Sequence, residues 1–366
     1  MIKVGIIGCG SISDIYLQNL THMFRNVEVY AVADLIEDRA IEAANKYNVP
    51  HVMTTDDLLS SPDIGIVVNL TTPQEHFHLC KQALLNGKHI YVEKPLSLST
   101  EQGDELVALA AEKQLLLGSA PDTFLGAGIQ TCRKLIDDGY IGKPVAATAF
   151  MVCHGHESWH PDPEFYYQHG GGPMLDMGPY YLTALVTLLG PAATVCGMTG
   201  AAFKERKITS DKKFGQIIPV EVATHVTGNI EFQSGAIASI ITSFDVWSST
   251  LPRIEIYGET GTLIVPDPNT FGGPIMYRPA GAEDFKEFPL VYSYGENSRG
   301  IGVADMANCI EHGGKPRANG ELANHVLEMM HAFQTSSDTK QYVTLKTNCE
   351  QPKPVAMGLT QGEFRN

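Results

Sequence analysis

The N-terminal stretch IKVGIIGCGSIS, residues 2 to 13, constrains the fold of this chain more than any other feature. A short apolar run rich in β-branched residues predicts a buried strand, glycines follow, and DIYLQNL then takes up helical spacing. Gly8 allows the tight turn, Gly10 lets backbone amides approach a pyrophosphate, and Ser13 stands where the dinucleotide fingerprint has its third glycine. We therefore expect a cofactor to be bound by Gly8, Gly10, Ser11 and Ile12.

Asp34 indicates which dinucleotide would bind. It ends the next apolar run, VEVYAVAD, close to the expected spacing of about 20 residues after the glycine turn. A carboxylate can accept hydrogen bonds from ribose hydroxyls and would repel a 2′-phosphate, and Leu35 and Ile36 offer no cation to bind one. Arg39 has the place of an ordinary exposed helix residue. The sequence therefore predicts NAD in preference to NADP.

The length of 366 residues predicts two domains. Over residues 1–120 strands alternate with helices such as QEHFHLCKQALLNG and STEQGDELVALAAEKQ, the second of which we expect Thr100 to cap. This rhythm predicts an α/β fold with an N-terminal Rossmann domain built on a doubly wound parallel sheet. Later runs such as VAATAFMVC, RIEIYGETGTLIVPDP and PLVYSY predict an α+β domain with a mostly antiparallel sheet over residues 121–345, and residues 346–366 are expected to form a surface tail.

Composition excludes several classes of protein. The net charge of -15 disfavours a nucleic-acid partner, and the one basic stretch, KERKITSDKK at residues 204–213, is expected to be a solvated loop. Seven cysteines without a CxxC pair argue against a disulfide framework or a zinc site and fit a reducing compartment. No apolar run reaches the length of a membrane span, and strand residues begin at once at the N-terminus, so we expect a cytoplasmic protein without a membrane partner.

Two stretches carry candidate catalytic residues. YVEKP puts Glu93 and Lys94 at the carboxyl end of a strand, the edge at which open α/β sheets bind ligands. Beside an oxidised nicotinamide, the pKa of Lys94 should be lowered, and its ammonium can stabilise a developing alkoxide. The alternative is a surface lysine at the end of a strand. In GGGPMLDMGPYYL, Asp176 and Tyr180 are four residues apart and share one helix face.

Together, GCGSIS, LTTPQEHFHLCKQALLNGKHIYVEKPLSLS and GGGPMLDMGPYYL resemble the Gfo/Idh/MocA family of NAD(P)-dependent oxidoreductases. The resemblance implies hydride exchange with sugars, inositols or related polyols, and a C-terminal domain whose open sheet joins homodimers or homotetramers. It also implies that Lys94 is the catalytic lysine. The loop along the cofactor would comprise Thr71, Thr72, Pro73 and His76, with Glu93 beside the lysine.

Tyr180 departs from the family's usual pattern, which has a histidine four residues after the aspartate. Alcohol oxidation needs a base for the hydroxyl proton, and tyrosine at its reference pKa of about 10 is a poor one. A neighbouring ammonium and the oxidised nicotinamide would lower that pKa. We predict that Tyr180 relays the proton with support from Lys94, while Asp176 holds a substrate hydroxyl. In the alternative, Tyr180 only lines the site and another group relays the proton.

The loop CHGHESWHPDPEFYYQHGGG supplies other candidate bases, namely His154, His156, His160 and His169. Its HxHxxxH pattern is compatible with a metal cluster, but no carboxylate or thiol completes it at a customary spacing. We favour a loop that faces the substrate, in which Trp159 stacks on a sugar ring and His160 or Asp162 binds hydroxyls, and we expect no metal.

The leading hypothesis is an NAD-dependent dehydrogenase or reductase acting on CH–OH groups of a sugar or polyol. The changed relay residue keeps a second hypothesis open, a redox-neutral glycosidase or lyase that retains its NAD. A third is a non-catalytic protein that senses dinucleotides, because a fold does not fix a function. The retention of Lys94 and Asp176 argues against this third hypothesis.

Overall fold

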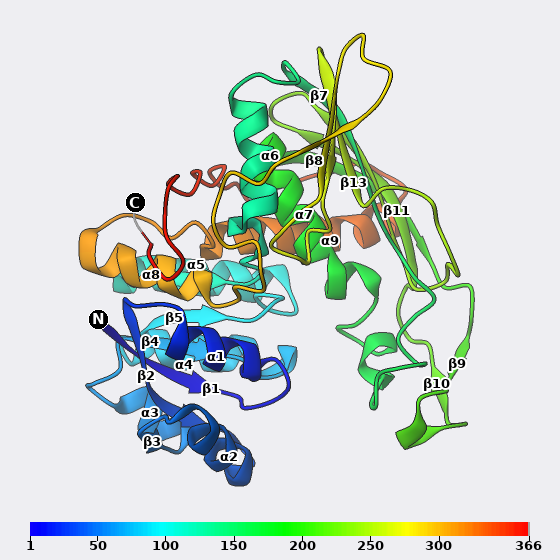
Figure 1. Ribbon diagram of the computed structural model, residues 1–366. Coiled ribbons are helices and arrows are strands. Elements are labelled where there is room, and N and C mark those ends of the chain that lie inside the picture. Colours follow the sequence, from blue (N-terminus) through cyan, green and yellow to red (C-terminus); the bar gives the residue numbers. More distant parts are fainter. Residues whose placement is uncertain (365–366) are drawn as a thin grey trace.

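The computed structural model describes residues 1–364 and contains two main sheets, one parallel and one mixed, with helices packed between them (Figure 1). The predicted α/β fold, a Rossmann sheet followed by a mostly antiparallel sheet, is confirmed. Among the described residues, no helix is both long enough and apolar enough to cross a membrane.

The first sheet has six parallel strands in the order β3-β2-β1-β4-β5-β6. The order reverses its direction beside β1, which creates the crevice where sheets of this type bind dinucleotides. Two short strands, β3 and β6, were not predicted. The strands are β1 (Ile2–Ile7), β2 (Val27–Ala33), β3 (His51–Val52), β4 (Ile66–Asn69), β5 (His89–Val92) and β6 (Leu117–Ser119).

Both faces of this sheet are buried, because side chains alternate between two apolar cores. Val4 and Ile6 of β1 belong to one core with the buried residues of the first helix, while Ile7 belongs to the other core with Leu84 and Leu106. This explains why the strands read as continuous apolar runs. The first five helices are α1 (Ser13–His22), α2 (Glu37–Tyr47), α3 (Thr55–Ser60), α4 (Pro73–Leu85) and α5 (Thr100–Lys113).

The predicted cap of α5 was wrong by one residue. Ser99 occupies the cap position with extended backbone angles, and its hydroxyl accepts a hydrogen bond from the amide of Gln102. Thr100 is the first residue inside the helix. Both residues have a hydroxyl that can cap, and the chain conformation decides between them.

The second sheet has nine strands in the order β16-β15-β14-β13-β7-β12-β11-β8-β17. All neighbours are antiparallel except β7 and β12. The expected strand in PLVYSY is wrong, because residues 289–294 contain no strand and the sheet ends at β16. The strands are β7 (Pro144–Val152), β8 (Ala192–Gly200), β11 (His225–Phe232), β12 (Ile237–Ser243), β13 (Ile254–Gly258), β14 (Gly261–Val265), β15 (Ile275–Pro279), β16 (Lys286–Phe288) and β17 (Val343–Thr344).

Within residues 1–364, helices cover one face of the nine-stranded sheet and leave the other face uncovered (Figure 1). Along β12 the side chains alternate, so that Ala238 and Ile240 are buried under these helices while Ile237 and Ser239 are exposed on the other face. The helices that follow β6 are α6 (Ala127–Asp137), α7 (Pro173–Leu189), α8 (Ile301–His312) and α9 (Gly320–Thr339), with 3₁₀ turns η1 (Thr123–Leu125), η2 (Glu164–Tyr167) and η3 (Asp211–Lys213). A separate hairpin of β9 (Glu205–Lys207) and β10 (Ile217–Pro219) projects at one end of the large sheet (Figure 1).

The C-terminal segment packs against the rest of the chain. Val355 and Leu359 are buried, and the amide of Val355 donates to the side chain of Gln130 in α6. Arg133 of the same helix donates to the carbonyl of Pro352. These contacts hold the segment along α6.

Candidate active site

The glycine turn after β1 has the shape that a pyrophosphate needs. Gly8 has φ +97°, and a Cβ there would lie 2.8 Å from the backbone of Leu70. A Cβ at Gly10, by contrast, would meet no atom within 4 Å, so this side of the turn is open. The cap position of α1, Ile12, makes no side-chain hydrogen bond to the helix. The first amides of α1 can therefore receive an anion.

Asp34 lies beside this turn and is oriented by backbone amides. Its carboxylate accepts hydrogen bonds from the amides of Cys9, at 2.7 Å, and Ile36, at 2.8 Å. A carboxylate has further lone pairs for the hydroxyls of a ribose. Leu35 next to it is fully exposed and supplies no positive charge.

His76 lies beneath the loop that precedes α4. It is fully buried, and its ring nitrogens lie 2.7 Å from the carbonyl oxygen of Pro95 and 3.1 Å from that of Thr71. Burial lowers the pKa of this histidine. His76 thus joins the loop of Thr71 and Thr72 to the turn after β5, instead of standing on the surface of that loop.

Lys94 follows β5 directly and reaches the first turn of α7. Its ammonium donates to the carboxylate oxygen Oδ1 of Asp176 at 2.8 Å and to the backbone carbonyl of the same residue at 2.9 Å. An ammonium has three N–H groups, so two are used by Asp176 and one remains for a substrate oxygen. Neighbouring Glu93 is also buried and accepts a hydrogen bond from Tyr16 at 2.8 Å.

Contact between Lys94 and Asp176 shifts the pKa of each side chain so that both are charged at neutral pH. Burial lowers the pKa of Lys94, but the charge of Asp176 and the groups of Tyr180 and Glu93 outweigh burial and hold it above its ordinary value. Burial likewise raises the pKa of Asp176, yet Lys94 and His156 outweigh it and lower the value to about 2. The lowered pKa of Lys94 is expected beside a bound oxidised nicotinamide, whereas here the carboxylate in direct contact raises it.

Tyr180 lies one turn after Asp176 on the same face of α7. Its ring centroid is 5.5 Å from the ammonium of Lys94. Burial raises the pKa of the phenol, while Lys94 and the guanidinium of Arg299 act in the opposite direction without cancelling this effect. The phenol is therefore a hydrogen-bond donor at neutral pH.

His156 reaches Asp176 from the other side. Its Nε2 lies 3.5 Å from the carboxylate oxygen Oδ2, so that Asp176 stands between the imidazole and the ammonium of Lys94. The ring is held among aromatic side chains, with its centroid 4.2 Å from that of Tyr166 and 4.7 Å from that of Phe244. Sequence reasoning had named His156 only as one of four histidines, because the pattern gave no reason to prefer it.

These side chains line one cavity of about 420 Å³, a size typical of sites for small molecules. It brings together the predicted Lys94, Asp176, Tyr180 and Trp159. The residues that the sequence did not single out are Met151, Val152, Cys153, Gly155, Tyr166, Met177, Tyr181, Arg253, Asp267 and Asn269. Several of them lie on β7 and on the loop after β14, whose approach to α7 depends on the fold.

His160 and Asp162 are outside this cavity lining. Asp162 forms ion pairs with Lys212, at 2.7 Å, and Lys213, at 2.9 Å, on the outer surface of the loop, and Lys212 lowers the pKa of its carboxyl to about 2. The Nδ1 atom of His160 accepts a hydrogen bond from the amide of Asp162. Trp159 does line the cavity and is 61% exposed, so its ring is available for stacking.

The histidines of the HxHxxxH pattern point in different directions. His154 stacks on Trp247 with a centroid distance of 3.4 Å, whereas His156 faces Asp176. Within residues 1–364, no three side chains of His, Cys, Asp or Glu are grouped so that they could hold a metal ion.

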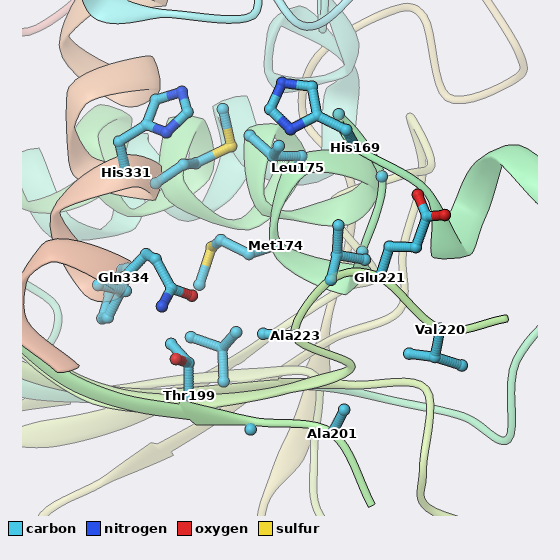
Figure 2. Close-up of a pocket in the computed structure, with 18 of the residues that line it drawn as sticks. His169, Met174, Leu175, Thr199, Ala201, Val220, Glu221, Ala223, His331 and Gln334 are labelled. Atoms are coloured by element: carbon cyan, nitrogen blue, oxygen red, sulfur yellow. The ribbon is translucent and has the colours of Figure 1, made fainter. Parts of the chain in front are cut away.

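A larger cavity of about 570 Å³ lies on the other side of the first turn of α7, between α9 and the ends of β8 and β11 (Figure 2). His169, Glu221 and His331 give it polar corners, and Met174 and Leu175 form an apolar wall. No residue of the glycine turn lines it, and neither does Lys94. The Lys94–Asp176 pair therefore lines the smaller of these two cavities.

Comparison with known protein families gives two matches along the chain. A model described as an oxidoreductase family with an NAD-binding Rossmann fold matches residues 2–120, and a model of the GFO/IDH/MocA C-terminal domain matches residues 129–264.

Curated relatives of the chain include sugar and inositol dehydrogenases. The myo-inositol 2-dehydrogenase of Thermotoga maritima is 23% identical over 353 residues, which cover 94% of this chain and 98% of the relative. The D-glucoside 3-dehydrogenase of Escherichia coli is 28% identical over 278 residues, covering 72% of this chain and 77% of the relative. Among solved structures, a levoglucosan dehydrogenase in complex with NADH has a TM-score of 0.80 and 20% identity, covering 94% of this chain and 99% of that one.

Proposed function

The chain belongs to the Gfo/Idh/MocA family of NAD-binding oxidoreductases, and on this premise we propose that it transfers a hydride between NAD and a CH–OH carbon of a sugar or cyclic polyol. One observation carries the proposal: Lys94, Asp176 and His156 meet in a single cavity at the carboxyl edge of the parallel sheet. When bound, the nicotinamide ring accepts or donates the hydride.

The N-terminal sheet would hold the dinucleotide. The open side of Gly10 and the amides of Ser11 and Ile12 fit the pyrophosphate, and the oriented carboxylate of Asp34 fits the ribose hydroxyls. We propose that Thr71, Thr72 and Pro73, with His76 beneath them, line the path toward Lys94, next to Glu93. Asp34 would favour NAD over NADP.

Lys94 would stabilise the charge on the reacting oxygen. In the oxidative direction, negative charge develops on the substrate oxygen as its proton is removed, and this charge is lost when the C=O bond forms and the hydride leaves the carbon. The free N–H of the ammonium can donate to this oxygen, and the raised pKa of Lys94 keeps the group charged. Asp176 would fix the ammonium and accept a second substrate hydroxyl.

His156 is the side chain that we assign as the proton acceptor. Its Nε2 lies 3.5 Å from the carboxylate of Asp176 in the same cavity lining, and histidine is the side chain that most often takes a proton in general base catalysis. Tyr180, the residue predicted from the sequence, would instead donate a hydrogen bond to the same oxygen, because burial raises the pKa of its phenol.

Trp159 would stack on the substrate ring at the mouth of the cavity. Its partial exposure and its position beside His156, at a centroid distance of 5.3 Å, support this role. His160 and Asp162 could bind only parts of a substrate that extend beyond the cavity, since Asp162 is paired with two lysines.

We further propose a homodimer or homotetramer formed through the uncovered face of the nine-stranded sheet. Ile237 of the central strand β12 is about half exposed, and Met198 of β8 is more exposed still. Apolar side chains on a wide, flat surface are typical of interfaces between subunits. All seven cysteines are free, which suits a reducing compartment such as the cytoplasm.

NADH formation in the presence of a panel of substrates tests the function. The panel should contain myo-inositol, methyl glucosides and levoglucosan, with NADP as the control cofactor. We expect NADH absorbance to rise with at least one of them and to rise more slowly with NADP. Turnover of a substrate without accumulation of NADH would contradict a dehydrogenase and favour a redox-neutral reaction. No turnover of any compound in either direction would argue for a sensor.

A further inference from the structure

The geometry points to Arg206 as a positioning residue that holds the loop of His156 against the active-site cavity. The inference rests on the proposed function, because His156 is there the proton acceptor. Arg206 lies on β9, in the basic stretch that we expected to be a solvated loop. That expectation was wrong for this residue, since its side chain is only 4% exposed.

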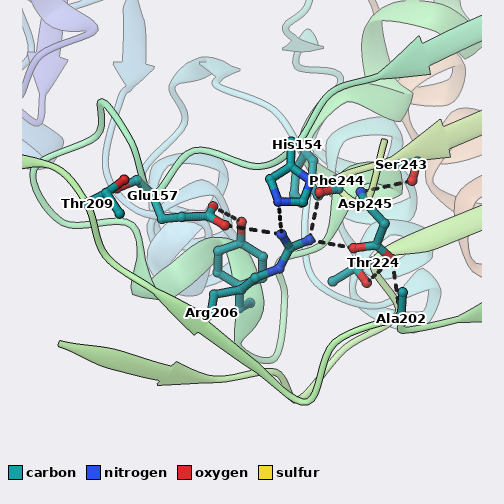
Figure 3. Close-up of polar contacts among 10 residues, drawn as sticks. His154, Glu157, Ala202, Arg206, Thr209, Thr224, Ser243, Phe244 and Asp245 are labelled. Carbon is teal, nitrogen blue, oxygen red and sulfur yellow. Dashed lines mark hydrogen bonds and ion pairs between the residues drawn. The ribbon is translucent and has the colours of Figure 1, made fainter. Parts of the chain in front are cut away.

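Arg206 makes four polar contacts on two sides of its guanidinium (Figure 3). Nη1 donates to the carboxylate of Glu157 at 3.2 Å and lies 3.3 Å from Nε2 of His154. Nη2 donates to the carbonyl of Phe244 at 2.7 Å and to the carboxylate of Asp245. Arg206 therefore joins the histidine loop to the end of β12.

Glu157 follows His156 directly in the sequence and anchors the loop. Its carbonyl accepts hydrogen bonds from the amides of Thr209 and Ser210, both at 2.9 Å, and its carboxylate accepts one from the hydroxyl of Tyr167. These contacts fix both the main chain and the side chain of Glu157. The backbone of His156 is held through them.

Phe244 provides a second connection to the imidazole. Its carbonyl accepts the hydrogen bond from Arg206, and its ring packs edge-on against the ring of His156 at 4.7 Å. A displacement of Arg206 would therefore reach His156 both along the loop and through a packed side chain. An error of about 1 Å in the position of a reacting group can cost about a hundredfold in rate.

The charges explain why arginine is needed here. Glu157 and Asp245 are both mostly buried carboxylates, and the guanidinium is bonded to both. A lysine would keep the positive charge, but it could not span the two carboxylates, His154 and a carbonyl with one planar group. Arg206→Lys thus changes the geometry while it leaves the net charge unchanged.

The kinetic test compares Arg206→Lys in the wild-type and His156→Gln backgrounds. If Arg206 acts through His156, the substitution lowers kcat by about tenfold to a hundredfold in the wild type and by less than twofold when His156 is already absent. The KM for NAD should stay unchanged in both. Lys207→Met, in the adjacent exposed position of β9, is the matched control and should leave kcat unaltered.

A second readout needs no turnover. The chain has two tryptophans, so that Trp247→Phe leaves Trp159 as the sole reporter in the histidine loop. We expect Arg206→Lys to lower the fluorescence anisotropy of Trp159 and to increase its quenching by acrylamide, with no change for Lys207→Met. If Arg206→Lys fails to fold, Glu157→Gln removes the charge of the same ion pair with nearly unchanged volume.

The outcomes separate this inference from the proposed function. An equal loss of kcat in both backgrounds, or an unchanged signal from Trp159, would overturn the positioning role. If the wild type turned over no substrate, the proposed function would fail, while the fluorescence of Trp159 would still decide whether Arg206 holds the loop.

Discussion

Replacement of Lys94 by methionine tests the chemistry of the cavity. The substitution keeps most of the volume of the side chain but removes the ammonium that binds Asp176 and that we propose donates to the substrate oxygen. Two of its N–H groups bind Asp176, so one donor to the reacting oxygen is lost, and loss of one such donor costs about 10²–10³ in kcat. Asp176 also loses its main cation, and the pKa of its carboxyl should rise from about 2.

Single-turnover formation of NADH measures the effect on the hydride step. NAD affinity, measured by calorimetry, should change little. Lys88→Met is a matched control, since Lys88 lies just before the other end of β5, where its buried ammonium donates to the carbonyls of Ser61 and Ile64. We expect this control to lose stability but to retain kcat. A Lys94→Met enzyme with a rate within about threefold of the wild type would refute the role of Lys94, because the reaction would then not need the hydrogen bond from its ammonium.

Three further predictions follow from the geometry. Gly10→Ala should keep the melting temperature and raise the Kd for NAD at least about tenfold, because its Cβ enters the open space of the turn. Gly8→Ala should unfold at a lower temperature, because its Cβ meets the backbone of Leu70. Calorimetry measures the Kd and thermal melts measure the unfolding temperature, and equal effects of the two substitutions would contradict the assignment. His156→Gln should lower kcat/KM at least about a hundredfold because it removes the proposed proton acceptor, while Tyr180→Phe should lower it about tenfold, and the reverse order would restore Tyr180 as the relay. The pKa of Asp176 is lowered on folding, so its contribution of about 2 kcal/mol is present above pH about 4 and lost as the pH falls toward 2. Urea unfolding across this range should show that the wild type loses about 2 kcal/mol more than Asp176→Asn, in which other carboxyls with lowered pKa values, such as that of Asp162, still titrate.

The N-terminal half of the site was predictable because its signals are local. The positions of Gly8, Gly10 and Asp34 follow from the spacing of one strand, turn and strand, and in the structure Gly8 is tightly packed, Gly10 is open and Asp34 lies beside the turn. Lys94 could be placed because a residue directly after a parallel strand must lie at the ligand-binding edge. Asp176 and Tyr180 could be paired because helical spacing puts them on one face.

The second half of the site depends on contacts between distant segments. His156 differs from His154 and His160 only by what faces it, and the partner, Asp176, lies on another element. Arg206 reads as one of several exposed charges in a basic stretch, and its burial depends on the approach of β9 to the end of β12. Loop geometry of this kind cannot be predicted from periodicity or composition.

Transfer of deuterium from the substrate to the cofactor tests the central claim most directly. With a substrate of this enzyme deuterated at the carbon to be oxidised, direct hydride transfer predicts that the label appears in NADH, as measured by mass spectrometry, and that the single-turnover rate is lowered by a primary isotope effect. Unlabelled NADH, or loss of the label to water, would contradict the proposal that the nicotinamide ring lies next to Lys94 in this cavity.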